Sequence, residues 1–214
     1  MTAIHHNPFD NLMMQLEKMP LWVKQVLYVN LRSDLEGTLA KTTLEGLGND
    51  NLLQLWVPEL SRDGKQQLSM DKPVVHQRML SVLRQIEQQR NIMHLAVSHQ
   101  WSLEQCCLVL LEALDQQLII VPKSSVVMGT IEYLAGRTRL GEYLVRINRL
   151  TQEQLEQALH TQTAISAAMG EKSGIANILI NLGYIKKEAS DAVLFLKEES
   201  RKTVDWSGWQ NPVS

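Results

Sequence analysis

The stretch RLGEYLVRINRLTQEQLEQALHTQ, residues 139–162, decides the fold of the C-terminal part of this chain. Its apolar residues do not form one continuous helical stripe, because Thr151 interrupts them with a helix-start signal. Thr151 and Gln154 have the spacing of a capping box, in which each side chain accepts a hydrogen bond from a backbone N–H. The pattern therefore predicts two helices joined by a tight corner, the second beginning after Thr151.

A second stretch, GIANILINLGYIKKEASDAVLFLK at residues 174–197, follows the same apolar frame. Three apolar positions of the first stretch recur in it at a constant offset of 35 residues: Leu144 and Leu179, Leu150 and Ile185, and Leu159 and Leu194. A constant offset indicates an internal repeat. We therefore expect the two stretches to fold as two equivalent helix pairs.

The residues of the first stretch also resemble a known motif. The pattern R-L-G-x-x-L, then Leu or Ile at the corner, then L-x-x-A-L-x-x-Q is similar to one copy of the MshEN domain. That domain is the N-terminal domain of secretion and pilus assembly ATPases of the GspE and MshE kind. The matching positions are Arg139, Leu140, Gly141, Leu144, Leu150, Leu155, Ala158, Leu159 and Gln162. The resemblance covers residues 137–200 and implies a C-terminal tandem helical repeat.

The resemblance also implies a ligand. In that family two tandem copies clasp cyclic di-GMP, and the leading Arg and closing Gln of a copy contact guanine or phosphate groups. Carried over to this chain, the ligand-binding positions are Arg139, Leu140, Gly141, Leu144 and Gln162. The second copy is degenerate: its replacements are Gly174 for the Arg, Ala176 for the Gly, Ser190 for the second-helix Leu and Lys197 for the Gln.

The segment over residues 137–149 is rich in arginine. Against one acid, Glu142, it holds Arg137, Arg139, Arg146 and Arg149. Guanidinium groups make paired hydrogen bonds to phosphate and stack on flat bases, and a glycine such as Gly141 lets the backbone approach a ligand closely. The alternative is a solvated basic face. Candidates for secondary ligand contacts are Arg137, Arg146 and, as a point charge in the second copy, Lys197.

Helical signals dominate the rest of the chain as well. We expect helices over 9–16, from Pro20, after the capping box Ser33-x-x-Glu36, over 73–91, 92–99 and 103–117, and over 124–136 with a stop at Gly136. The pair Asp63-Gly64 predicts a loop, and the segment LIIVP at 118–122 predicts a short strand. This order of helices and strand resembles a winged helix.

These patterns predict a mainly α protein in three parts. The first is an N-terminal helical domain over residues 1–128, winged-helix-like with a small β ribbon. The second is the MshEN-like tandem repeat over residues 129–203, and the third is a tail over 204–214. The tail holds Trp206 and Trp209, which we expect to pack on the body or on a partner.

Composition narrows the class of protein. The 214 residues are 44% hydrophobic and 21% charged, which is ordinary for a globular protein, and the net charge of −2 gives no general attraction to nucleic acid. No apolar run approaches the roughly 18–20 residues of a membrane helix, and the N-terminus lacks a signal-peptide pattern. Adjacent Cys106 and Cys107 cannot form an ordinary disulfide. We therefore expect a cytoplasmic protein without a membrane span.

Signatures of catalysis and metal binding are missing from the sequence. Gly64-Lys65 lacks the glycine frame and the following Ser or Thr of a phosphate loop, and no Gly-x-Ser-x-Gly or His-Glu-x-x-His occurs. His94 and His99 are five residues apart, which misses the i, i+4 spacing of a helical metal site. We expect no enzyme, no metal and no cofactor.

Three functions remain open at this point. The resemblance implies a regulatory or adaptor protein that responds to cyclic di-GMP and acts on a protein partner of a secretion, pilus or biofilm system. The first alternative is a docking module that binds a protein without nucleotide. The second is a winged-helix-like transcription regulator. Its recognition helix would be residues 103–117, which carry three acids and no Lys or Arg, so nucleic acid is not the expected partner.

Overall fold

The computed structural model describes residues 18–24, 53–169 and 173–204. This part is 66% helical and contains no strand, which confirms the mainly α prediction. Its elements are η3 (Leu53–Leu55), α4 (Arg62–Ser69), α5 (Gln77–Glu87), α6 (Ile92–His99), α7 (Leu103–Asp115), α8 (Ser125–Leu134), α9 (Leu140–Arg146), α10 (Gln152–Met169), α11 (Ile175–Asn181) and α12 (Lys187–Glu199). The expected features at residues 9–16, Ser33, Glu36, Trp206 and Trp209 lie outside the described residues.

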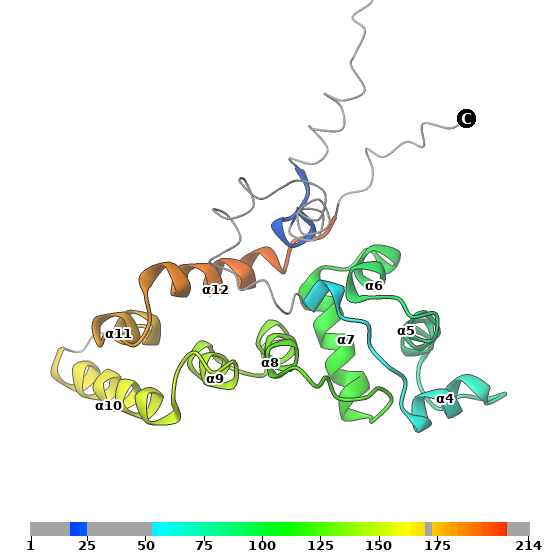
Figure 1. The fold of residues 1–214 in the computed structure, drawn as a ribbon, viewed down its shortest axis with the longest axis horizontal. Coiled ribbons are helices and arrows are strands. Elements are labelled where there is room, and N and C mark those ends of the chain that lie inside the picture. Colours follow the sequence, from blue (N-terminus) through cyan, green and yellow to red (C-terminus); the bar gives the residue numbers. More distant parts are fainter. Residues whose placement is uncertain (1–17, 25–52, 170–172, 205–214) are drawn as a thin grey trace, which may run out of the picture.

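The helices surround one continuous apolar core, whose residues run from Met19 to Val204 in the sequence. Helix α7, predicted over residues 103–117, is its centre, with most of its length buried between α6 and α8. The chain then steps away from α7 through α8 and α9, and α12 returns across them toward the start of α7 (Figure 1). The expected domain border at residue 128 falls inside α8, which packs against both α7 and α9. The division into domains stays a prediction.

Most of the helix ends follow one local rule. Gly136 has the positive φ of a helix stop, as predicted, and its N–H donates to the Tyr133 carbonyl at 3.1 Å. The next N–H, from Arg137, donates to the Glu132 carbonyl at 2.8 Å, which completes a Schellman motif. The same pattern, with a left-handed residue after the helix, recurs at Gln89, Gln100, Gln117, Asn148 and Gly183.

The prediction of a loop at Asp63-Gly64 is wrong, because both residues lie in α4. The Ser61 hydroxyl caps this helix by accepting the Gly64 N–H at 3.0 Å. A Cβ on Gly64 would lie 2.1 Å from the Leu118 carbonyl oxygen. The glycine is therefore needed for close packing of a helix on another segment, and not for a hairpin turn.

The predicted strand over 118–122 is also wrong. The segment makes only one isolated antiparallel bridge, between Leu60 and Ile119. The helix predicted over 73–91 is shorter than expected, since His76 Nδ1 caps α5 by accepting the Met79 N–H at 3.1 Å. The helices expected over 92–99 and 124–136 are present as α6 and α8.

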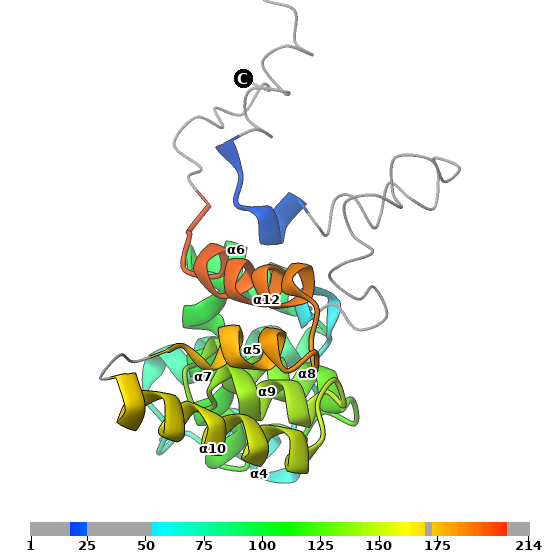
Figure 2. The ribbon, with the colours of Figure 1, turned by 90° about the vertical axis from the view of Figure 1, so that its left-hand side faces the viewer.

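Both predicted helix pairs are present. Helices α9 and α11 begin at Leu140 and Ile175, and α10 and α12 begin at Gln152 and Lys187, so both starts are 35 residues apart. Seen from the side, α10, α11 and α12 lie one above another (Figure 2). The Thr151 capping box closes as predicted, with Thr151 Oγ1 accepting the Gln154 N–H at 3.2 Å and Gln154 Oε1 accepting the Thr151 N–H at 2.9 Å.

The two corners also share their backbone hydrogen bonds. In the first copy the Arg149 N–H donates to the Leu144 carbonyl at 2.8 Å, and in the second the Tyr184 N–H donates to the Leu179 carbonyl at 3.0 Å. The left-handed residues of the corners, Asn148 and Gly183, are again 35 residues apart. The repeat is therefore a repeat of backbone geometry as well as of sequence.

The residue between the two helices of a pair differs between the copies. A Cβ on Gly141 would lie 2.4 Å from Leu155 Cδ1, so a larger residue at this position would require the Leu155 side chain to shift. The equivalent residues of the second copy are Ala176 and the buried Ser190. In the second copy, the residue on the first helix is larger (Ala176 for glycine) and the residue on the second helix is smaller (Ser190 for leucine). The smaller side chain of Ser190 therefore compensates for the loss of glycine.

The segment over residues 18–24 is fastened to the end of α12. Trp22 is fully buried, and its Nε1 donates to the Lys202 carbonyl at 3.0 Å. The Leu21 N–H donates to Glu199 Oε2 at 3.1 Å. Burial alone would raise the pKa of Glu199, but hydrogen bonds from Lys202 and from the Leu21 N–H hold that pKa below its ordinary value.

We predict that Gly141→Ala lowers the free energy of unfolding, because displacing the buried Leu155 side chain costs about 1–3 kcal/mol while the better helix propensity of alanine in α9 returns only about 0.5–1 kcal/mol. The double variant Gly141→Ala, Leu155→Ser reproduces the second copy. It should lose less stability than the sum of its two single changes, as measured by urea unfolding. Gly174→Ala is the control, since its Cβ meets nothing within 4 Å, and should change stability by less than about 0.5 kcal/mol. Additive losses would contradict the compensation.

Candidate functional site

Arg139 is the one charged residue among the predicted ligand-binding positions, and its guanidinium has no partner within residues 18–24, 53–169 and 173–204. It is the N-cap residue of α9, and its backbone N–H donates to Glu142 Oε2 at 2.7 Å. The residue is exposed, and its guanidinium makes no hydrogen bond or ion pair with the rest of the described chain. A guanidinium in this state can still bind an anion or stack on a base.

The neighbouring predicted positions face the core. Leu140, Gly141 and Leu144 are buried, and Leu140 and Leu144 belong to the continuous apolar core. Leu155 occupies the space beside Gly141 that we expected a ligand to approach. These three residues therefore pack α9 against the rest of the fold.

Gln162 serves the connection between the two copies. Its Nε2 donates to the Ser173 carbonyl at 2.7 Å. Ser173 lies just before the second copy, so this bond ties the middle of α10 to the start of the next helix pair. The amide nitrogen at the closing position of the motif is thus already engaged within the chain.

Two of the expected secondary contacts are paired with acids. Arg137 forms a two-point pair with Asp115, and its Nη1 donates to Asp115 Oδ1 at 2.9 Å. The hydrogen bond from Arg137 lowers the pKa of the Asp115 carboxyl. Arg146 Nη1 lies 2.9 Å from Glu132 Oε2 as an ion pair without hydrogen-bond alignment. Both guanidinium groups brace α8 against its neighbours.

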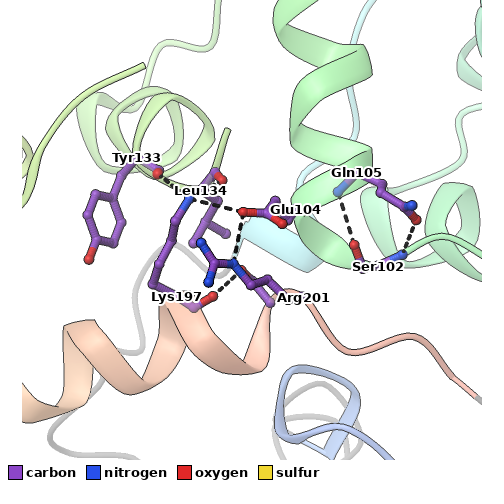
Figure 3. Close-up of polar contacts among 8 residues, drawn as sticks. Ser102, Glu104, Gln105, Tyr133, Leu134, Lys197 and Arg201 are labelled. Atoms are coloured by element: carbon purple, nitrogen blue, oxygen red, sulfur yellow. Dashed lines mark hydrogen bonds and ion pairs between the residues drawn. The ribbon is translucent and has the colours of Figure 1, made fainter. Parts of the chain in front are cut away.

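Lys197 has the most partners of the candidate residues. It reaches from α12 to the C-terminal end of α8, where its Nζ donates to the Tyr133 carbonyl at 2.9 Å and to the Leu134 carbonyl (Figure 3). Glu104 Oε1 of α7 lies 3.3 Å from the same Nζ. The C-terminus of a helix carries partial negative charge and favours a cation. Lys197 therefore joins three helices that are distant in the sequence.

Glu104 completes this clasp at the start of α7. Its carboxylate also accepts from Arg201 Nε at 3.2 Å, and its backbone N–H donates to the Ser200 carbonyl at 2.9 Å (Figure 3). The other acids of the same helix are paired too, Glu112 with His76 at 3.0 Å and Asp115 with Arg137. Each acid of α7 thus contacts a side chain from another part of the chain. The sequence analysis noted the three acidic residues of this helix but did not predict their partners.

A polar cluster between α8 and α9 was missed by the sequence analysis. The rings of Tyr133 and Tyr143 stack with centroids 4.6 Å apart, and Thr130 Oγ1 lies 3.3 Å from the Tyr143 hydroxyl. Burial raises the pKa of Tyr133 to about 12, so its phenol stays protonated. Polar residues on two predicted helices were the only signal in the sequence. The cluster fixes α9 on α8 and offers no reactive group.

A shallow hollow of about 400 Å³ lies beside the first corner. Its lining residues are Val145, Asn148, Arg149, Leu150, Thr151, Gln152 and Gln154. Neither Arg139 nor Gln162 lines it. The hollow has one cation, from Arg149, and several amide groups, so it could hold a small anion but not a ligand that bridges the predicted residues.

The described residues include neither a reactive cysteine nor a cluster of side chains that could bind a metal. Cys106 and Cys107 are buried, and burial raises the pKa of the Cys106 thiol to about 12, which leaves it unreactive. Residues 18–24, 53–169 and 173–204 hold no group of three His, Cys, Asp or Glu side chains placed to hold a metal. Within the same ranges, no helix has the length and apolar character needed to cross a membrane.

We predict that Lys197→Met lowers the free energy of unfolding by about 2 kcal/mol, because it removes bonds to the end of α8. Lys187→Met, at an exposed lysine on the same helix, is the matched control and should stay within about 0.5 kcal/mol of the wild type. Urea unfolding of both variants and of the wild type measures this difference in stability. Equal stability of the two variants would argue against the structural role of Lys197.

No family model, characterised protein or solved structure matches this chain. The resemblance to the MshEN domain therefore stays a prediction that is based on residues 139–162 and their repeat.

Proposed function

We propose that this chain is a non-enzymatic adaptor whose tandem helix-pair repeat docks a protein partner without needing a bound nucleotide. One observation carries the proposal. Leu159 and Leu194 occupy the same position in the two copies, and their exposed fractions are 45% and 46%. Single exposed leucines are common on protein surfaces. An apolar residue kept exposed at the same place in both copies supports a role in contact with other molecules.

The contacts of the polar motif residues favour docking over nucleotide binding. Gln162 is engaged by Ser173, and Lys197 by the end of α8. Gly174 brings no side chain to the leading position of the second copy. The resemblance to secretion-ATPase N-terminal domains suggests a partner from a secretion, pilus or biofilm system, met in the cytoplasm.

The docking proposal predicts a specific contact at Leu159. A photo-activated cross-linking amino acid placed at position 159 of the full chain, in the native cell, should give one discrete adduct with another protein. The same group at His160, exposed on the same helix and turned by about 100°, is the matched control and should not. Leu159→Ala should weaken binding of the isolated partner roughly tenfold, the usual loss at an interface anchor. Equal adducts at both positions would contradict the proposal.

A second candidate function, a cyclic di-GMP sensor acting on the same partner class, is favoured by Arg139. Its guanidinium is exposed and has no partner in the described part of the chain. If binding occurs, the first copy carries it, since the second copy lacks the leading arginine. The transcription-regulator alternative is favoured by no described contact, because the acids of α7 are turned to the fold's own cations and His76.

The sensor candidate predicts heat on calorimetric titration with cyclic di-GMP and none with GTP or cyclic di-AMP. Arg139→Ala should weaken that binding roughly ten- to a hundredfold, through loss of charge-assisted bonds, without changing the melting temperature. Arg84→Ala, at an exposed arginine of α5, serves as the control and should bind like the wild type. Absence of heat and of thermal shift at millimolar ligand would eliminate the sensor and leave the docking proposal standing.

A further inference from the structure

The outward face of α12 carries an apolar pair beside an acidic hollow. Leu194 and Phe195 have exposed fractions of 46% and 47%. They line a hollow of about 540 Å³ together with three carboxylates, and its lining contains no Lys or Arg. These carboxylates belong to Glu188, Asp191 and Glu198, and none of them makes an ion pair with a described residue.

A second hollow, of about 660 Å³, adjoins the first and has the opposite charge. Phe195 lines both hollows. The second hollow has one carboxylate, Glu199, against the cations of Lys18, Lys24, Arg201 and Lys202. One exposed aromatic ring thus lies between an acidic and a basic surface.

We infer that two copies of this chain associate through this face, about a twofold axis at Phe195. A twofold contact pairs each surface with its counterpart on the other copy, so the acidic hollow of one copy would lie over the basic hollow of the other. Charge complementarity of this kind selects the correct pairing and speeds association. The inference extends the proposed function, since Leu194 of the second copy of the repeat lies on the same face.

The spacing along α12 supports this arrangement. Glu188 precedes Phe195 by seven residues, and Lys202 follows it by seven. Seven residues within a helix are about two turns, which places Glu188 on the same side of α12 as Phe195. Lys202 lies beyond the end of α12 and lines the basic hollow on the other side of Phe195. In an antiparallel pair of α12 helices centred on Phe195, the hollow that Glu188 lines therefore faces the hollow that Lys202 lines on the other copy.

Lys202 can bind a carboxylate of the second copy in addition to its present partner. Lys202 is exposed, and its Nζ bonds Glu199 within its own copy. An ammonium has three donors, so Lys202 can also bind Glu188 of the second copy. One helix face with a short flanking segment is a small interface, and small interfaces give weak, reversible association.

Sedimentation equilibrium of the full chain, from about 1 µM to about 1 mM, tests the inference. The wild type should show a reversible monomer–dimer equilibrium that weakens with added salt. Glu188→Lys and Lys202→Glu should each weaken the dimer at least about tenfold. An equimolar mixture of these two variants should restore association, because every reversed charge then faces an opposite one. Glu87→Lys, the same charge change at an exposed residue of α5, should leave the dimer constant within about twofold.

Several results would overturn the inference. One is a wild type that stays monomeric over the whole range, and another is a dimer that Glu188→Lys and Glu87→Lys affect equally. If Lys202→Glu lowers the melting temperature, Phe195→Ser replaces it, and an unchanged dimer in that variant also counts against the inference. Its failure is distinguishable from failure of the docking proposal, since a monomeric chain can still give the adduct at position 159, and a dimer can form without that adduct.

Discussion

The clasp formed by Lys197 is the interaction on which the arrangement of the helices depends. Its ammonium bonds the last carbonyls of α8 and the carboxylate of Glu104 at the start of α7. Three helices from different parts of the chain therefore meet at one cation. The same end of α12 also accepts hydrogen bonds from Trp22 and Leu21, so the clasp positions the helix end to which the segment over residues 18–24 is bound. Gln54 Nε2 binds the Trp22 carbonyl as well.

The clasp also explains why the second copy departs from the first. At the position where the first copy has Gln162, bonded to the next copy, the second has Lys197, bonded to α8. The change at the inner packing position, from Gly141 and Leu155 to Ala176 and Ser190, keeps the helix pair closed with different volumes. The differences that weaken the motif are thus changes that fit the second copy to its own neighbours.

This distribution of contacts suggests a division of labour. In the first copy, the Arg139 guanidinium has no partner among the described residues and Leu159 is exposed, so under the proposed function this copy is the one to meet a ligand or a partner. The second copy closes the fold on the inside and presents charged and apolar groups on the outside. A scaffold of repeated helix pairs allows this, because each pair needs only its inner face to stay packed.

The sequence by itself determined the features that arise between residues close in the chain. Helix type, the capping box at Thr151, the stop at Gly136 and the 35-residue frame depend on local hydrogen bonds and periodicity, so they could be predicted. Only the tertiary structure decided the helix at Gly64, the lack of a strand at 118–122 and the partners of Gln162, Arg146 and Lys197. The reason is that each depends on a group from another part of the chain, whose approach no local pattern encodes.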